Sequence, residues 1–128
     1  MKPEQKSLID YRRYRSEDCL KEAELLIQHN HFNAAVNRLY YACFYIVSAL
    51  LLSEDMYSAK HSGIISLFNR HWVRHQRVDK SLGRFYKEIF SYRQKGDYDD
   101  LVYFEREQAE LLYQEATAFV NILKSKLP

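Results

Sequence analysis

Charged and aromatic residues gather in the stretch "FSYRQKGDYDD", residues 90–100, in greater number than a plain helix–helix connection needs. Arg93 is a permanent cation, and Asp97 can act as a base where its environment raises its pKa. Tyr98 adds a phenol that is mostly protonated at pH 7. Arg93, Asp97 and Tyr98 are therefore the candidate catalytic residues of the chain.

The same stretch has an ordinary structural interpretation. A cation near the end of a helix is favoured by the helix dipole, so Arg93 can simply stabilise a helix that stops at the next glycine. Asp99 or Asp100 suits the N-cap of a following helix. Asp97 would then pair with the arginine or a neighbouring lysine, and Tyr98 would pack against the end of the bundle. Spacing alone favours this structural interpretation.

The stretches "NAAVNRLYYACFY" and "SAKHSG" hold four candidate binding residues, Arg38 and Tyr41 in the first and Lys60 and His61 in the second. An arginine and a phenol inside an apolar helix need polar partners. Carboxylates of neighbouring helices, Asp97 among them, can supply these partners, or the group can form a pocket for phosphate or a base. Lys60 and His61 precede a short helix, where free N–H groups also suit an anion. For each residue taken singly, a structural role is the simpler alternative.

Basic residues gather just before the opening stretch and acidic ones follow it. Residues 70–95 hold eight Lys or Arg against two acids, and residues 97–115 hold seven acids against one Arg. The run "RHWVRHQR" could follow an RNA backbone and stack a base on Trp72. A solvated helix face with Trp72 in the core explains the run equally, and we favour it because charge runs alone are poor indicators of partners.

Composition excludes several classes of protein. The length of 128 residues and the net charge of +2 fit one globular domain, residues 1–128, without a nucleic-acid-like excess of charge. Cys19 and Cys43 lie within helical patterns, so neither a disulfide framework nor a metal site is expected, and no cofactor is implied. The longest apolar run, Leu39–Leu52, is shorter than the 18 or so residues of a membrane span. We therefore expect a cytoplasmic protein that does not enter membranes.

The periodicity of apolar residues predicts an all-α protein. Glycine and proline are scarce, and both prolines lie at the chain ends, which favours a few long helices over many short strands. The expected architecture is an up-and-down four-helix bundle with an additional short helix. Its helices are predicted over residues 6–28, 33–53 and 64–73, from Asp79 or Ser81 to a stop at Gly96, and from just after Asp99 or Asp100 onward.

Three motifs in order give the chain a family resemblance. "FNAAVNRLYYACFYIVSALL", "KHSGIISLF" and "YRQKGDYDD" resemble the HEPN family over residues 10–126, and within it the small stand-alone prokaryotic HEPN proteins. The resemblance implies a bundle of four or five helices that pairs as a homodimer. It also implies a partner, because such proteins are often encoded beside a minimal nucleotidyltransferase (MNT) in toxin–antitoxin pairs.

The resemblance further implies a site for RNA or a nucleotide. Many HEPN toxins are metal-independent endoribonucleases whose signature is an arginine, four to six residues, and a histidine. The arginine carries over to Arg93, which would stabilise the charge on the phosphate. The histidine position is Tyr98 at the shortest spacing and Asp99 or Asp100 at the longer ones, and no histidine lies in this stretch. We therefore expect nucleotide or RNA binding. The alternatives are an active ribonuclease that uses Asp97 or His61 as its base, and a non-catalytic dimeric interaction module.

Overall fold

Helices account for the fold, and no strand is present. The computed structural model describes residues 1–128. A short π-helical turn, η1 (Asn69–Val73), continues the third helix. The helices are α1 (Pro3–Gln28), α2 (Phe32–Leu52), α3 (His61–Phe68), α4 (Lys80–Tyr98) and α5 (Arg106–Lys124). The predicted all-α bundle with one short extra helix is confirmed.

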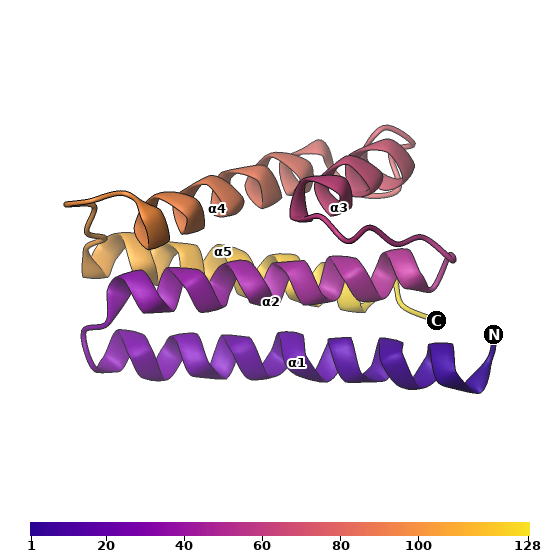
Figure 1. Cartoon of the computed structure of the whole chain (residues 1–128), viewed down its shortest axis with the longest axis horizontal. Helices are drawn as coiled ribbons and strands as arrows, with labels where there is room; N and C mark the ends of the chain where they lie inside the picture. The colour runs from indigo at the N-terminus through magenta and orange to yellow at the C-terminus, as the bar shows by residue number, and fades with distance from the viewer.

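The long helices run alternately up and down the bundle (Figure 1). Helix α2 packs against α1, α5 and α4, so it is the central element. Helices α3 and α4 lie on the side of α2 opposite to α1. Both chain ends lie at one end of the bundle, and the α4–α5 connection projects from the other.

Burial of α2 explains its composition. A helix that is apolar nearly all round is stable where neighbours cover most of its surface. Most α2 side chains are buried, and many of them belong to a core cluster of 25 residues. By length and composition α2 is the one helix capable of crossing a membrane, but 67% of the qualifying window is buried inside the bundle, as in the core helix of a soluble protein.

Gly96 does not end α4, which corrects the sequence prediction. The helix continues to Tyr98, and Gly96 lies within it. A Cβ built on Gly96 would lie 2.8 Å from Cε2 of the Phe104 ring. The glycine therefore allows the buried Phe104 ring to approach the helix backbone. In the sequence, a glycine kept for this reason cannot be told from one that ends a helix.

The last helix begins later than predicted, so Asp99 and Asp100 are not its caps. Glu105 is the N-cap of α5, and it forms a reciprocal capping box with Gln108.

The segment between α4 and α5 is held by the side chain of Asn33. The Asn33 amide donates to the Val102 carbonyl at 2.8 Å and to the Gly96 carbonyl at 3.4 Å, and its oxygen accepts from the Phe104 amide at 2.9 Å.

The third helix begins at His61, three residues before the predicted start, and its end is π-helical.

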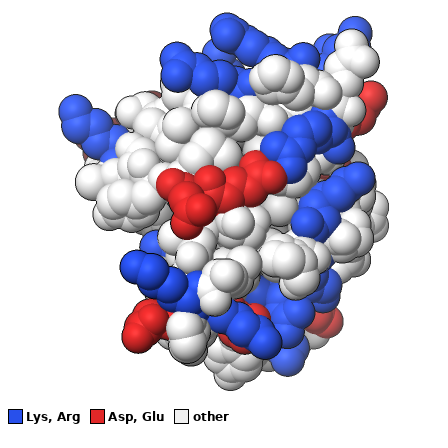
Figure 2. All heavy atoms as spheres, turned by 90° about the vertical axis from the view of Figure 1, so that its right-hand side faces the viewer, with Lys and Arg blue, Asp and Glu red and all other residues white.

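Within the basic run, Trp72 is buried in the core, as the structural interpretation predicted. The Arg77 guanidinium lies 3.4 Å from the centroid of the Trp72 ring and pairs with Glu54. Figure 2 shows this end of the molecule, where Lys and Arg side chains are scattered among acidic and neutral ones and form no continuous basic surface.

Candidate functional site

Arg93 lies on the inner face of α4, against α2. Only 7% of the residue is exposed, yet its guanidinium donates no hydrogen bond within the chain, and Nε is buried without a partner. Its one ion pair, between NH1 and Oδ2 of Asp97, is 3.5 Å long, and its Cζ lies 4.8 Å from the centroid of the Tyr40 ring. Because a buried charge is costly unless its donors are satisfied, this arginine has unused capacity for an anion.

A chain of polar contacts leads from Arg93 across α2. Asp97 lies one helical turn after the arginine, and its Oδ2 accepts a 2.9 Å hydrogen bond from the Asn37 amide. The Asn37 oxygen in turn accepts two hydrogen bonds from the Arg38 guanidinium, from Nε at 3.1 Å and from NH2 at 2.7 Å. The sequence predicted polar partners for this face of α2, with Asp97 among them. Asn37, rather than Arg38, makes the contact to Asp97.

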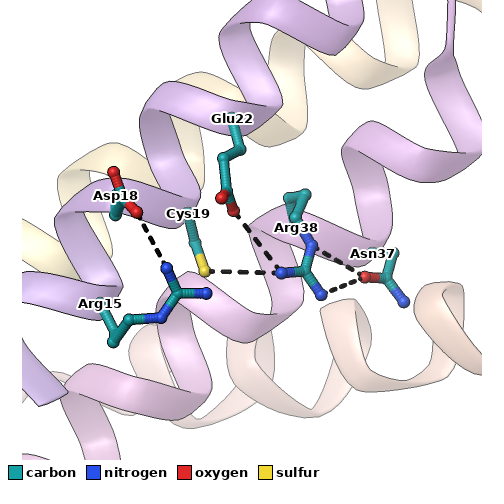
Figure 3. Close-up of polar contacts among 6 residues, drawn as sticks. All are labelled: Arg15, Asp18, Cys19, Glu22, Asn37 and Arg38. Atoms are coloured by element: carbon teal, nitrogen blue, oxygen red, sulfur yellow. Dashed lines mark hydrogen bonds and ion pairs between the residues drawn. The ribbon is translucent and has the colours of Figure 1, made fainter.

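The far end of the chain of contacts lies on α1 (Figure 3). Arg38 reaches Oε1 of Glu22 at 3.5 Å and Sγ of Cys19 at 4.0 Å, and its Cζ lies 5.0 Å from the centroid of the Tyr41 ring. Burial raises the pKa of the Cys19 thiol to about 11, so the thiol is protonated at neutral pH. Cys19 therefore packs beside Arg38 and supplies no thiolate nucleophile.

His61, the first residue of α3, packs against Tyr40 and Tyr41, the rings that also lie near Arg93. Its Nδ1 lies 2.7 Å from the Tyr40 hydroxyl, and its ring stacks on Phe44 with centroids 4.6 Å apart. Nε2 makes no hydrogen bond within the chain. Burial, and secondarily the charge of Arg93, lowers the pKa of His61, so the imidazole is neutral at pH 7. A neutral imidazole and a buried cation thus both border Tyr40.

Tyr40 stays protonated at this site. Burial raises the pKa of its phenol far above the ordinary value, although the nearby Arg93 acts in the opposite direction. The hydroxyl can donate to Nδ1 of His61, or accept from it in the other tautomer. Tyr40 therefore orients His61 in either protonation pattern and carries no charge itself.

The structure brings together five of the seven predicted site residues. Arg93, Asp97, Tyr41 and His61 lie where α2 faces α4 and α3, and Arg38 joins them from the side of α1 through Asn37 and the Tyr41 ring.

Tyr98 and Lys60 do not join this group. Tyr98 ends α4, is 74% exposed, and its side chain makes no hydrogen bond. Lys60 is exposed at the N-cap of α3, and its ammonium group pairs with no side chain. A surface cavity of about 750 Å³ lies near the start of α4 and includes none of the predicted residues.

Two residues of the site were absent from the predicted set. Tyr40 is fully buried, and its position in an apolar run is typical of a core residue. Asn37 is polar at a position three residues before Tyr40, so the two share one helical face. This face of α2 also carries Tyr41 and Phe44. An amide and a phenol three residues apart on it were the signal from which Asn37 and Tyr40 could have been predicted. The resulting arrangement can hold an anion at Arg93, with the His61 imidazole bonded to the Tyr40 side chain that the guanidinium also contacts.

Comparison with known proteins places the chain in a family. The family model described as HEPN domain matches residues 9–126. A protein of Thermotoga maritima named "UPF0332 protein" is 42% identical over 121 residues, which cover 94% of this chain and 92% of that protein. A protein of Gloeobacter violaceus named "UPF0332 protein glr0978" is 33% identical and covers 95% of this chain and 94% of its own length.

A third relative carries a name that refers to toxicity. The protein of Methanocaldococcus jannaschii named "Putative toxin MJ0142" is 34% identical over 113 residues, which cover 88% of this chain and 77% of that protein. The match to the family model extends from α1 to beyond the end of α5 and includes every residue of the site. The chain belongs to the HEPN domain family.

Proposed function

We propose that this HEPN protein binds a phosphate group of RNA or of a nucleotide at Arg93. The observation that carries the proposal is the state of this side chain, which is buried, positively charged and without a hydrogen bond inside the chain. An arginine fork is suited to phosphate oxygens, which can satisfy two of its donors at once. The neighbouring His61 adds a further donor at Nε2 when a bound anion raises the pKa of the imidazole.

Asp97 stands where a phosphate oxygen would bind. Its carboxylate lies 3.5 Å from the arginine, longer than the roughly 2.7–2.9 Å of a good charge-assisted hydrogen bond. The Asp97 side chain is 26% exposed, so it can turn toward water when a stronger anion arrives. Asn37 would then be free to donate its amide hydrogen to the ligand.

A binding titration tests this function. Fluorescently labelled RNA and ATP are titrated into the protein, into the Arg93→Ala variant and into a control, Arg84→Ala. Arg84 is an exposed residue of the same helix and forms no ion pair. We expect Arg93→Ala to weaken binding at least tenfold and Arg84→Ala to leave it within twofold of the parent. Equal losses in both variants would reduce the interaction to nonspecific attraction by charge, and no binding by the parent would refute the proposal.

Metal-independent cleavage of RNA is a second candidate function, favoured by the position of His61. Cleavage by the 2′-hydroxyl needs a base to remove its proton, a cation to stabilise the phosphorane and an acid to protonate the leaving 5′-oxygen. Nε2 of neutral His61 can take the proton in the tautomer whose Nδ1–H donates to the Tyr40 oxygen. Arg93 supplies the cation, and the imidazolium formed in the first step can return its proton to the 5′-oxygen.

An RNA cleavage assay separates binding from catalysis. Purified protein is incubated with total RNA, with and without EDTA, beside the His61→Gln and Arg93→Ala variants. Cleavage that survives EDTA and is lost in both variants is the expected result for this candidate. Cleavage that persists in His61→Gln would assign the base elsewhere, to Asp97 in the first instance. Binding without cleavage in all samples would leave the nucleotide-binding function and remove the nuclease.

Partnership is the third part of the proposal. Two relatives whose names begin "Putative toxin" support a role in a toxin–antitoxin-type pair. We propose an MNT-type nucleotidyltransferase as the partner, and the cytoplasm as the location. We also propose that residues 1–128 act as one domain and form a homodimer. A monomer mass in light scattering at micromolar concentration would refute the dimer. A dimer that binds neither RNA nor ATP would instead favour a non-catalytic interaction module.

A further inference from the structure

The α4–α5 connection displays an unusual set of apolar side chains. Tyr98, Leu101 and Tyr103 are 74%, 86% and 78% exposed, and they are the three most exposed large apolar side chains of the chain. All three lie within six residues, at the end of the bundle away from both termini (Figure 1). We call these three side chains the loop surface. Single exposed apolar residues are ordinary, whereas a local group of them indicates an interaction site.

Leu101 has an unfavourable backbone conformation as well as an exposed side chain. Its backbone is left-handed, with φ of 61°, a conformation that suits glycine or a short polar residue. The other non-glycine residues with positive φ are polar ones, Asn30, Asp55 and Gln76. Leu101 is therefore both strained in its backbone and unburied in its side chain. Packing within the chain compensates neither disadvantage, and backbone strain of this kind is concentrated at functional sites.

The loop surface is nevertheless held in place. Phe104 is buried against Gly96. The Asn33 side chain bonds the Gly96 carbonyl before the loop surface, at 3.4 Å, and the Val102 carbonyl and Phe104 amide at its other end. The displayed side chains are thus mounted on a fixed backbone. A surface that is already ordered loses less conformational entropy on binding, which favours a specific partner.

Charge around the loop surface selects the kind of partner. Residues 95–107 around it hold five carboxylates, of Asp97, Asp99, Asp100, Glu105 and Glu107, against two cations, Lys95 and Arg106, and Arg106 pairs with Glu110. These carboxylates repel the phosphates of nucleic acid and of anionic lipids. They attract lysine and arginine, and exposed tyrosines are frequent anchors in protein interfaces. We propose that the loop surface docks a protein whose contacting face is apolar at its centre and rich in Lys and Arg around it.

This inference is separate from anion binding at Arg93. The Arg93 guanidinium is directed inward against α2, whereas the loop surface points to solvent. The two therefore predict opposite responses to mutation. Leu101→Asn suits the left-handed backbone and removes the apolar side chain, so it should fold, keep RNA or ATP binding and lose the partner. Arg93→Ala should do the reverse.

Site-specific photocrosslinking identifies what docks. p-Benzoylphenylalanine replaces Tyr103 in the full chain, which is expressed in the organism that carries the gene and irradiated there. The matched control places the same amino acid at Tyr14, which is 62% exposed on α1. We expect one protein with a basic surface to crosslink from position 103 and not from position 14. No crosslink, equal crosslinking from both positions, RNA, or a second copy of this chain at position 103 would each overturn the proposal.

The crosslinked protein is then purified and its affinity for the parent chain is measured by calorimetry. We expect Leu101→Asn to weaken binding at least tenfold. The separate variant Asp99→Asn should also weaken binding, and it should make the affinity less dependent on salt. Tyr14→Ser should stay within twofold of the parent. Unchanged affinity in Leu101→Asn, with the variant shown to be folded by circular dichroism and still able to bind RNA or ATP, would refute docking at the loop surface.

Discussion

Arg93→Met should stabilise the protein while removing anion binding. The variant keeps an unbranched side chain of similar reach in the same aromatic surroundings, and methionine fills such spaces readily. It removes the charge together with the buried Nε–H that has no partner. A structural arginine would show the opposite response, so the experiment separates the two roles.

The magnitude follows from the contacts. Relieving a buried unpaired donor is worth about 1–3 kcal/mol, to which the lower desolvation cost of a neutral side chain adds. Against this, the variant loses the attraction of the guanidinium for the Tyr40 ring at 4.8 Å, about 1 kcal/mol. It also loses the 3.5 Å ion pair with the part-exposed Asp97, about 0.5 kcal/mol. We expect the free energy of unfolding to rise by about 1 kcal/mol.

Urea denaturation followed by circular dichroism at fixed protein concentration measures this change. Arg77→Met is the control, because Arg77 stacks on Trp72 at 3.4 Å and pairs with Glu54. Its removal should lower the free energy of unfolding by about 1 kcal/mol. A fall of more than about 1 kcal/mol in Arg93→Met would refute the reasoning, since it would make Arg93 a structural residue whose partners are already sufficient.

Three further outcomes are expected from the fold and the site. Asn33→Ala should lower the free energy of unfolding by about 2 kcal/mol, because two short hydrogen bonds are lost and the Phe104 amide is left unpaired. Urea denaturation measures this loss. Unchanged hydrogen exchange of the Phe104 amide would contradict the prediction. The lowered pKa of His61 means that the unfolded chain binds more protons than the folded one just below pH 6.5. Stability should therefore fall as pH decreases from 6.5 through the folded pKa, and His61→Gln should lessen this fall in denaturation at pH 7 and pH 5. Leu101→Asn should raise the free energy of unfolding by about 0.5 kcal/mol, because it removes the strain of a leucine in the left-handed conformation. A lower melting temperature in thermal denaturation would instead show that the leucine side chain stabilises the loop.

The helices were predictable because their apolar residues repeat with the helical period over long segments. The connection from α4 to α5 was not, since two local signals there have more than one meaning. Gly96 provides space for Phe104 inside the helix rather than a stop after it. Asp99 and Asp100 have the right chemistry for an N-cap, but the capping box forms at Glu105. Which of several possible caps is used depends on how the connection packs against Asn33.

The site was predictable only where its residues lie close together in the sequence. Arg93 and Asp97 are one helical turn apart, so their contact follows from spacing. His61 joins them through the packing of α3 against α2, which no local pattern reveals. Tyr40 was missed because a tyrosine in an apolar run usually belongs to the core. It does belong to the core, and its hydroxyl also bonds the imidazole.

The placement of both termini at one end of the bundle has a mechanical consequence. A force that pulls residues 1 and 128 apart acts at that end alone and separates the neighbouring helices α1 and α5 turn by turn, as a zipper opens. Only a few side-chain contacts resist at any moment, whereas pulling from opposite ends would load them all together. The protein should therefore yield at low force when it is stretched between its two ends, and the α4–α5 connection at the far end would be among the last parts to bear the load.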